Sequence, residues 1–578
     1  MRTFFSDIFS KYEKLCAVRY IINNQLIEKS YYELYCDVMK VSKYFITKGT
    51  EIRVGLIGKN TYEWIVIFLG TMYANGTVIP IDSQLDDAKI CELLNLSDAN
   101  FVVVDGKIKK WKNGELHLGS FDDCNEVKDP LKELCEDKKF FEDEKNDECI
   151  CLLLFTSGTS GEQKCVELTN VSLRSDCEMV YESLSSLLIR HKVIMNLLPM
   201  YHAYAIMVDI LLTFYSGNCL CICRGMKSLE KDLKIYKPEV MFVVPMILEF
   251  FAEKVKNIVN RYDFPDCTAK TRDFFGGNLA FLVSGGAPIS EQVVSIMNHV
   301  NIDVYLGYGM TECSPVISVM NAKENYDKRS VGSPLKCNEV RIKNGEIQVK
   351  GKNVMKGYYR DKIATDQVMD EGWLKTGDTG YINENGHLYV TGRIKNIIIL
   401  SNGENIAPQE IEDKVKEYLE IEDVIVFEDK IFSSSGKLSI GICVSHKGED
   451  VVFGIEQKIQ QLNVHQPLYK RINGIYVTEQ EFIRTSTYKI NRKETVKMLR
   501  RETICKTILN LLRENINNKG IQLSTNIHTE VEIDSLHLMI FLGEVEEKFE
   551  IELYDEDIRK WRSVLDIINC VETLIEKR

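Results

Sequence analysis

The segment CLLLFTSGTSGEQK, residues 151–164, decides the fold, because an apolar run passes directly into a loop of small and hydroxyl-bearing residues. Near-continuous apolar character is typical of a strand buried in a parallel sheet that is covered on both faces. The loop composition lets backbone N–H groups and hydroxyls approach an anion closely, although it also suits an ordinary turn. The GxxxxGK[ST] pattern of P-loop NTPases is absent. The candidate phosphate contacts are Thr156, Ser157, Gly158, Thr159, Ser160, Gly161 and Lys164.

Similar apolar runs alternate with helical patterns along the first 390 residues, which predicts an α/β layout with more than one sheet. The elements become shorter near residue 393, and a charged joint, NRKETVKMLRRE (491–502), precedes a final stretch with only helical patterns. We therefore predict a large N-terminal domain over 1–392, a small α/β domain over 393–495 and an all-α domain over 503–578. The runs that predict strands are VGLIG (54–58), FVVVD (101–105), VIMNLLP (193–199) and VMFVVP (240–245).

Composition places the chain among ordinary soluble proteins, with 45% hydrophobic and 27% charged residues. There is no apolar run of 18 residues, so no membrane-spanning helix is expected, and the first helical pattern lacks the features of a signal peptide. The 18 cysteines include no CxxC pair, and the cluster CLCIC (219–223) fits a buried strand better than a zinc site. This cysteine usage implies a reducing, cytoplasmic location.

The charge is uneven along the chain. Residues 526–578 hold 14 acidic and 6 basic side chains, a net charge of 6 − 14 = −8 out of −13 for the whole chain. An acidic segment argues against nucleic-acid binding, which needs a basic surface. Docking on a basic partner protein and plain solubility both remain open as its role.

Five further segments follow the loop in a fixed order. Together they resemble the adenylate-forming superfamily of acyl-CoA synthetases, nonribosomal-peptide adenylation domains and luciferases, over residues 30 to 495. The resemblance implies ATP, Mg²⁺ and a carboxylic acid that is converted to acyl-AMP with release of pyrophosphate. It also implies that the small α/β subdomain is mobile. The five segments are LPMYH (198–202), SGGAP (284–288), GYGMTE (307–312), KTGDTGYINENGHLYVTGRIKNIIILSNGENIAPQEIE (375–412) and RTSTYKINR (484–492).

Adenylation joins two anions, so it needs cations and positioning to overcome their repulsion. The resemblance implies that Lys489 bridges the carboxylate and the α-phosphate, that Thr311 hydrogen-bonds this phosphate and that Glu312 holds Mg²⁺. Tyr488 stands before this lysine where the family usually has glycine. The other implied roles are the ribose for Asp378, the ribose or phosphate for Arg393, adenine stacking for Tyr308, the adenine edge for Gly286, Ala287 and Pro288, and a rotation hinge for Lys395.

The residues of these motifs are more similar to those of fatty acyl-CoA synthetases than to those of amino-acid-activating enzymes. Relatives that activate amino acids carry an aspartate soon after the LPMYH segment, and Asp209 lies too far along to match it. Gly285 and Gly286 leave room for an aliphatic chain beside the adenylate. We expect His202 and Gly285 in the acyl pocket, with a helix-start histidine as the other interpretation of His202.

The acidic segment contains VEIDSLHLMIFLGEVEEKFEIEL (531–553), which resembles the DSL motif of acyl carrier proteins, with Glu532 in place of the usual glycine. The resemblance implies a four-helix carrier whose Ser535 bears a covalent 4′-phosphopantetheine arm, although a serine here also suits a simple helix cap. A phosphopantetheinyl transferase and a downstream acyl-accepting enzyme are the implied partners. A flexible joint would present the thiol at an effective concentration on the order of millimolar.

The combined expectation is a fatty acid–acyl carrier protein ligase that loads its own carrier domain. Two alternatives remain open. One is an acyl-CoA synthetase that uses free coenzyme A, and the other is a non-catalytic scaffold whose carrier only recruits partners.

Overall fold

A computed structural model of the chain divides into two compact units, Met1–Val390 and Thr391–Arg578, each described here by itself. The division falls close to the change in element length expected near residue 393. Among the described residues, no helix is both long and apolar enough to cross a membrane. The residues described are 1–49, 51–111, 148–157, 163–263, 266–327, 329–399, 405–421, 423–429, 431, 437–444, 449–464, 466–484, 490–516, 520–527 and 535–577.

The first unit contains a mixed seven-stranded sheet whose central strands are parallel and buried. The segment CLLLF lies in this sheet, parallel to β4 on one side and antiparallel to β8 on the other, so the expectation of parallel neighbours holds on one side only. The strand order is β18 (Gly357–Tyr358), β8 (Gln163–Thr169), β7 (Ile150–Ser157), β4 (Thr77–Ile81), β3 (Arg53–Ile57), β5 (Phe101–Val104) and β6 (Lys107–Lys110).

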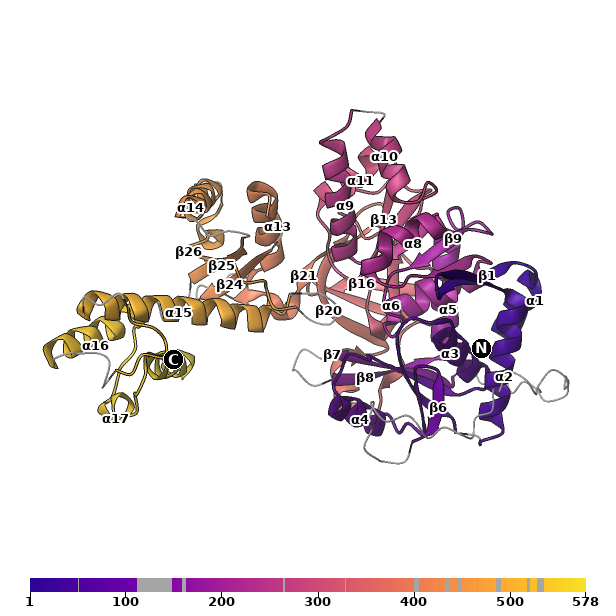
Figure 1. Ribbon diagram of the computed structural model, residues 1–578, viewed down its shortest axis with the longest axis horizontal. Coiled ribbons are helices and arrows are strands. Elements are labelled where there is room, and N and C mark those ends of the chain that lie inside the picture. Colours follow the sequence, from indigo (N-terminus) through magenta and orange to yellow (C-terminus); the bar gives the residue numbers. More distant parts are fainter. Residues whose placement is uncertain are drawn as a thin grey trace. The chain divides into compact units, whose positions relative to one another are not determined.

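A nine-stranded sheet forms the second layer of this unit (Figure 1). Buried residues from both sheets belong to one hydrophobic core. Its cysteine-rich strand, β10, is fully buried, as the CLCIC pattern predicts. The described residues contain no cluster of three potential metal ligands. The strand order is β15 (Ser333–Pro334), β14 (Val316–Val319), β13 (Asp303–Gly309), β12 (Phe281–Ser284), β11 (Val240–Val243), β9 (Val193–Asn196), β10 (Cys219–Ile222), β1 (Cys16–Ile22) and β2 (Gln25–Ser30).

The strands of a third sheet lie in the order β16 (Asn338–Lys343), β17 (Glu346–Gly351), β20 (Trp373–Ile382) and β19 (Met369–Asp370), and β21 (Leu388–Arg393) also pairs with β20.

The starts of two helices are set by side-chain caps. The Ser30 side chain accepts the N–H of Glu33 at the start of α2, and the Thr169 side chain accepts the N–H of Ser172 at the start of α5. The helices of this unit are α1 (Arg2–Tyr12), α2 (Tyr31–Ile46), α3 (Tyr62–Tyr73), α4 (Asp87–Leu96), α5 (Asn170–Leu184), α6 (Ala203–Ala205), the π-helix η1 (Ile206–Leu212), α7 (Thr213–Tyr215), the 3₁₀ turn η2 (Met226–Ser228), α8 (Leu229–Tyr236), α9 (Pro245–Val259), α10 (Asp266–Phe274), α11 (Glu291–His299), the 3₁₀ turn η3 (Thr311–Cys313) and α12 (Lys362–Val368).

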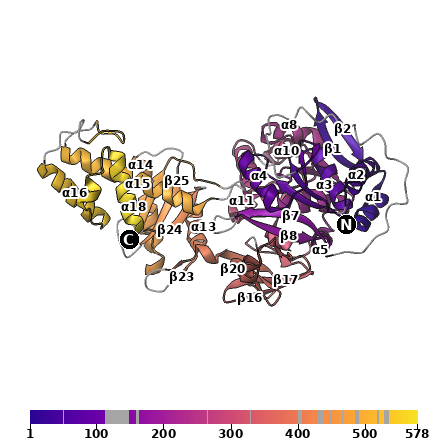
Figure 2. The ribbon, with the colours of Figure 1, turned by 90° about the horizontal axis from the view of Figure 1, so that it is seen from below.

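The second unit begins with a small α/β part and ends with helices (Figure 2). A three-stranded sheet orders β24 (Val424–Asp429), β25 (Lys437–Cys443) and β26 (Gly474–Thr478), and β22 (Ile398–Ile399) pairs with β23 (Asn405–Ile406). The helices are η4 (Ile394–Asn396), α13 (Pro408–Leu419), α14 (Glu449–Val464), η5 (Leu468–Lys470), α15 (Arg492–Ile516), α16 (Ser535–Phe549), α17 (Asp555–Ile558) and α18 (Val564–Lys577).

The charged stretch expected as a flexible joint belongs to α15, one continuous helix of 25 residues. At its start, Leu499 packs with Ile425 and Tyr476 of the small sheet, and further along, Ile508 belongs to the same hydrophobic cluster as Phe541 of α16. The expectation of a flexible tether is therefore wrong for these residues. The physical reason is that their apolar positions recur at helical spacing and are buried at both ends of the helix.

Candidate active site

The phosphate-loop candidates lie at the end of the hairpin formed by β7 and β8. Thr156 is paired with Lys164 across this hairpin, so the chain leaves and returns at one place. The Lys164 ammonium lies 4.6 Å from the ring centroid of Tyr358. Only the backbone of Ser157 is described, and four candidates lie outside the described residues: Gly158, Thr159, Ser160 and Gly161.

Glu312 lies in the turn η3, which Thr311 begins, and its side chain is buried. The Tyr358 hydroxyl donates a hydrogen bond of 2.9 Å to Glu312 Oε1, and the Met355 N–H donates one of 2.8 Å to the Glu312 carbonyl. Burial and the neighbouring carboxylate raise the pKa of Tyr358 above its usual range, so the phenol keeps its proton. The segment that contains Tyr358 therefore fixes both the backbone and the carboxylate of Glu312.

A second buried carboxyl supports the chain just after this turn. Asp176 of α5 accepts 2.8 Å and 3.3 Å hydrogen bonds from the Asn353 amide and the Val316 N–H. The same Asn353 amide donates to the Val316 carbonyl at 2.8 Å. Burial raises the pKa of Asp176 well above its usual range, while its two oxygens accept the bonds from Asn353 and Val316.

Tyr308 and Asp378 meet from different sheets. The Tyr308 hydroxyl donates a 2.7 Å hydrogen bond to Asp378 Oδ2, and only 3% of Asp378 is exposed. Burial raises the pKa of Tyr308, so it remains a donor. The predicted adenine-stacking residue is therefore also the residue that orients the predicted ribose carboxylate, a link that the sequence motifs did not indicate.

The glycine motif lies directly after β12, with Gly286 at φ +93°, a value that favours glycine. A Cβ on Gly285 would lie 3.2 Å from Cζ of Tyr204, whose hydroxyl donates to the Val283 carbonyl at 3.1 Å. His202 occupies the N-cap position of α6, two residues before Tyr204, and its ring centroid lies 4.3 Å from that of Tyr201. Ala287 and Pro288 continue the motif away from β12.

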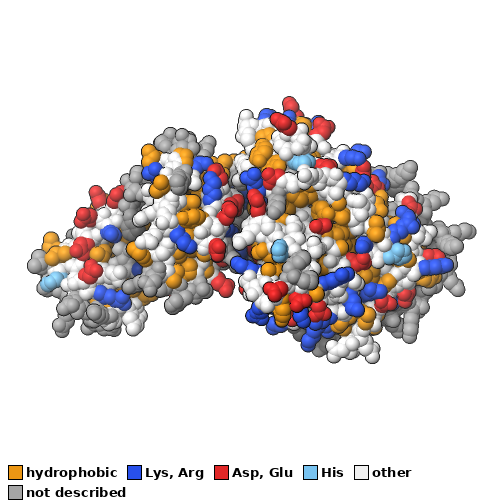
Figure 3. All heavy atoms as spheres, turned by 90° about the horizontal axis from the view of Figure 1, so that it is seen from above, with side chains coloured by type: hydrophobic (Ala, Val, Ile, Leu, Met, Phe, Trp, Pro, Cys, Tyr) orange, Lys and Arg blue, Asp and Glu red, His pale blue; other side chains and the backbone are white. Residues whose placement is uncertain are grey.

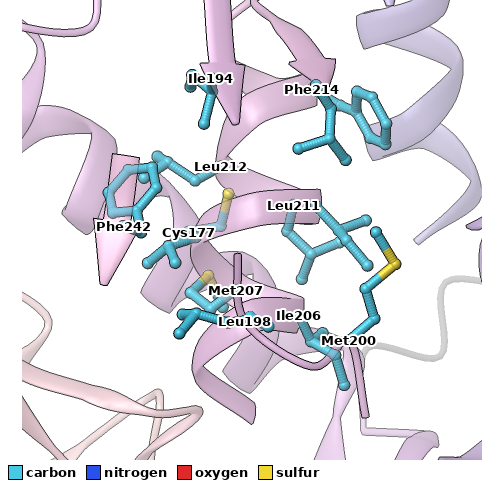
Figure 4. Packing of buried hydrophobic residues seen from close by; sticks show 14 of the residues in the cluster. Cys177, Ile194, Leu198, Met200, Ile206, Met207, Leu211, Leu212, Phe214 and Phe242 are labelled. Carbon is cyan, nitrogen blue, oxygen red and sulfur yellow. The ribbon is translucent and has the colours of Figure 1, made fainter. Parts of the chain in front are cut away.

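Apolar side chains surround the helix that follows His202. Figure 4 shows Ile206, Met207, Leu211 and Leu212 of η1 packed with residues of neighbouring elements. Asp209 is fully buried in the same helix, where it accepts a 2.6 Å hydrogen bond from Asn196, and burial raises its pKa well above the usual range. The carboxyl of Asp209 is therefore enclosed by the fold and hydrogen-bonded to Asn196.

The remaining candidates belong to the second unit. Arg393 ends β21, Lys395 lies in η4 and Ser535 is the first residue of α16, while Lys489 and Tyr488 lie outside the described residues. Met539 of α16 is 71% exposed, and Figure 3 shows acidic and apolar side chains side by side at this end of the unit.

Glu312 is the carboxylate that the sequence motif assigns to Mg²⁺, an ion that one or two carboxylates can hold together with phosphate oxygens and water. Mg²⁺ is commonly bound in that way in phosphate-transfer sites. The buried Glu312 fits such an ion, since its backbone and one carboxylate oxygen are held in place.

Sequence reasoning missed three residues of this site: Tyr358, Asp176 and Asn353. None of them lies in a motif, and each resembles an ordinary core or turn residue in the sequence. The segment GYYR (357–360) contains two tyrosines after a glycine, and nothing in it predicts a contact with Glu312.

Two family models match the chain: AMP-binding enzyme over residues 10–359, and phosphopantetheine attachment site over residues 502–571. A long-chain-fatty-acid–CoA ligase of Xenopus laevis, ACSBG2, is 28% identical over 488 residues, which cover 72% of this chain and 66% of the relative. FadD15 of Mycobacterium tuberculosis, named as the same kind of ligase, is 28% identical over 313 residues, 48% of this chain and 52% of the relative. The chain thus spans about half to two thirds of the length of these relatives.

Solved structures share the fold. ATP-bound MatB from Rhodopseudomonas palustris has a TM-score of 0.70 at 19% identity and covers 86% of this chain and 98% of its own. The o-succinylbenzoate coenzyme A synthetase of Bacillus subtilis, in complex with ATP and magnesium, has a TM-score of 0.67 at 19% identity, covering 85% and 99%. The chain therefore belongs to the AMP-binding enzyme family of adenylate-forming ligases and carries a phosphopantetheine attachment segment after its adenylation domain.

Proposed function

We propose that this enzyme activates a carboxylic acid as acyl-AMP and transfers the acyl group to a phosphopantetheine thiol on its own Ser535. In the first step a carboxylate oxygen attacks the α-phosphorus of ATP, and pyrophosphate leaves. In the second step the thiolate sulfur attacks the acyl carbon, the bond to the AMP oxygen breaks, and AMP leaves. The observation that carries the proposal is the attachment segment on the same chain as the AMP-binding domain.

The buried pairs of the first unit suit the first step. Asp378, oriented by Tyr308, would accept hydrogen bonds from the ribose hydroxyls, because a carboxylate has room for several donors. Lys164 lies at the base of the phosphate loop with its charge beside Tyr358, and Thr311 would donate to the α-phosphate. Mg²⁺ bound at Glu312 would supply neutralisation of phosphate charge.

A rotation in the second unit would change the enzyme from the first step, adenylation, to the second step, thiol transfer. We infer that Lys489 stabilises the charge of the first step, that Arg393 contacts the ribose or phosphate and that rotation at Lys395 withdraws Lys489 before thiol transfer. Because α15 is continuous, such a rotation would carry the start of the attachment segment with it.

A fatty acid is the substrate class we propose. The curated relatives quoted above are named as long-chain-fatty-acid–CoA ligases. The buried side chains packed around η1, the helix that follows His202, are mostly apolar. Asp209 is fully buried and bonded to Asn196, so its carboxyl is not presented to a substrate ammonium.

The test uses the full-length protein, first modified by a phosphopantetheinyl transferase and coenzyme A and then freed of coenzyme A. A library of carboxylic acids is screened by pyrophosphate release, and the acyl mass on the peptide containing Ser535 is measured. The Ser535→Ala variant is the control, because it should still release pyrophosphate but gain no mass.

Three outcomes separate the candidate functions. Acid-dependent acyl mass on Ser535 supports the proposal. Pyrophosphate release that requires added free coenzyme A, without mass on Ser535, supports acyl-CoA synthesis instead. An absence of acid-dependent pyrophosphate release across the library favours a non-catalytic scaffold that recruits partners through its carrier.

A further inference from the structure

We propose that Tyr358 is a positioning residue that holds the Glu312 carboxylate in place and keeps the Lys164 ammonium on its ring face. This inference rests on the proposed function only through the role of Glu312 as the Mg²⁺ carboxylate. Tyr358 is 6% exposed and Glu312 is 8% exposed, so water does not readily replace the bond between them.

The two ends of the tyrosine side chain meet the two groups. Its hydroxyl donates to Glu312 Oε1 at 2.9 Å, and the Lys164 Nζ lies 4.6 Å from its ring centroid, within cation–π range. A phenol is a single donor, so its bond takes up one acceptor site of the carboxylate. The ring thus lies between a cation suited to phosphate and a carboxylate suited to a metal ion.

The backbone around Tyr358 connects the same two places. Ahead of it, the Met355 N–H donates to the Glu312 carbonyl at 2.8 Å. After it, the Tyr359 N–H donates to the carbonyl of Cys165, the residue next to Lys164, at 2.7 Å. Residues 355–359 therefore act as a strut between the turn η3 and the phosphate-loop hairpin, and Tyr358 is the side chain at its centre.

The backbone of Tyr358 is itself held. Its N–H donates to Thr365 Oγ1 at 2.9 Å, and β18 pairs with β8 through Tyr358 opposite Val166. A phenylalanine fits the same space and retains the contact with Lys164 but cannot donate to Glu312. A leucine loses both contacts, so the two substitutions separate the role of the hydroxyl from that of the ring.

The experiment measures Mn²⁺ binding by electron paramagnetic resonance of free Mn²⁺, with the full-length protein and a non-hydrolysable ATP analogue. In parallel, the Mg²⁺ dependence of pyrophosphate release and the KM for ATP are determined. The matched control is Tyr359→Phe, because the Tyr359 hydroxyl bonds Asp98 at 2.6 Å and not Glu312. Thermal denaturation confirms that each variant is folded.

We expect Tyr358→Phe to raise the Mn²⁺ dissociation constant about tenfold, the effect of one lost hydrogen bond to a charged acceptor. Its KM for ATP should change less. Tyr358→Leu should raise both quantities, because Lys164 is then free to turn towards Glu312, and Tyr359→Phe should stay within about twofold of wild type in both.

Unchanged Mn²⁺ binding in whichever folded Tyr358 variant is obtained would overturn the inference. Equal losses in Tyr358→Phe and Tyr359→Phe would also overturn it, because the effect would then be general to the segment. If the wild-type protein releases no pyrophosphate with any acid, the proposed function fails, while the Mn²⁺ titration still decides the role of Tyr358.

Discussion

Replacing Tyr308 with phenylalanine removes one oxygen atom and leaves the aromatic ring in place. The lost bond is the 2.7 Å donation to Asp378 Oδ2. Because only 3% of Asp378 is exposed, solvent cannot easily replace this donor. A hydrogen bond to a charged group contributes about 1.5–3 kcal/mol, which corresponds to about a tenfold to a hundredfold change in an equilibrium.

If Asp378 must be held in place to bind the ribose, this loss appears in the interaction with ATP. We expect kcat/KM for ATP to fall about tenfold to a hundredfold, with little change in KM for the acid. Initial rates of acid-dependent pyrophosphate release, with ATP varied at saturating acid, measure this effect. The assay temperature must lie well below the unfolding midpoint of both proteins.

Tyr305→Phe is the matched control, since Tyr305 lies on the same strand, β13, and packs its ring against Phe281. It should leave kcat/KM for ATP within about twofold of wild type. The reasoning is refuted if Tyr308→Phe also leaves kcat/KM for ATP unchanged while the protein remains folded. The ring of Tyr308 alone would then account for its contribution to binding.

Three further substitutions test other parts of the structure. Gly309→Ala places a Cβ 1.9 Å from the Pro315 carbonyl oxygen, so the chain around Glu312 must shift, and kcat should fall on the order of a hundredfold. Gly454→Ala is the control, because a Cβ there meets open space and should leave kcat unchanged. Asp209→Asn removes a carboxyl whose pKa is raised by burial, so the free energy of unfolding of the wild type decreases as pH rises from the unfolded-state pKa towards the folded-state pKa. The free energy of unfolding of the variant, measured by urea titration, should therefore decrease less between pH 5 and 8 than that of the wild type. Parallel pH dependences of the two proteins would contradict this. Ile508→Ala should lower the free energy of unfolding of the second unit by about 2–5 kcal/mol in urea titrations, and a loss below about 1 kcal/mol would argue against its burial in the core.

The sequence predicts the fold well where burial and periodicity agree. The apolar runs at 54–58 and 101–105 become the adjacent parallel strands β3 and β5, and the change in texture near residue 393 marks the start of the second unit. The antiparallel pairing of β8 with β7 was not predicted, because a pattern of apolar residues does not indicate the direction in which the next strand runs. The 491–502 stretch was misread because its charges outnumber the apolar residues that are buried.

Candidate site residues could be predicted only where a motif contains them. Glu312, Asp378 and Tyr308 were predicted from ordered segments and remain predictions, and the structure brings the last two into contact. Tyr358 was not predicted, because its proposed role depends on Glu312 and Lys164, which lie 46 and 194 residues earlier in the chain. A contact made only in the folded chain cannot be derived from the residue types alone.

The continuity of α15 changes how the carrier segment can be moved. A rigid helix transmits angle as well as distance: each inserted residue turns everything beyond it by about 100° and advances it by about 1.5 Å. One alanine inserted between Leu499 and Ile508 would therefore aim the helices of the carrier in a new direction, whereas seven would nearly restore the direction about 10 Å further away. If Ser535 carries the proposed arm, the number of residues in this helix, and not the length of a flexible tether, would determine where that arm can reach.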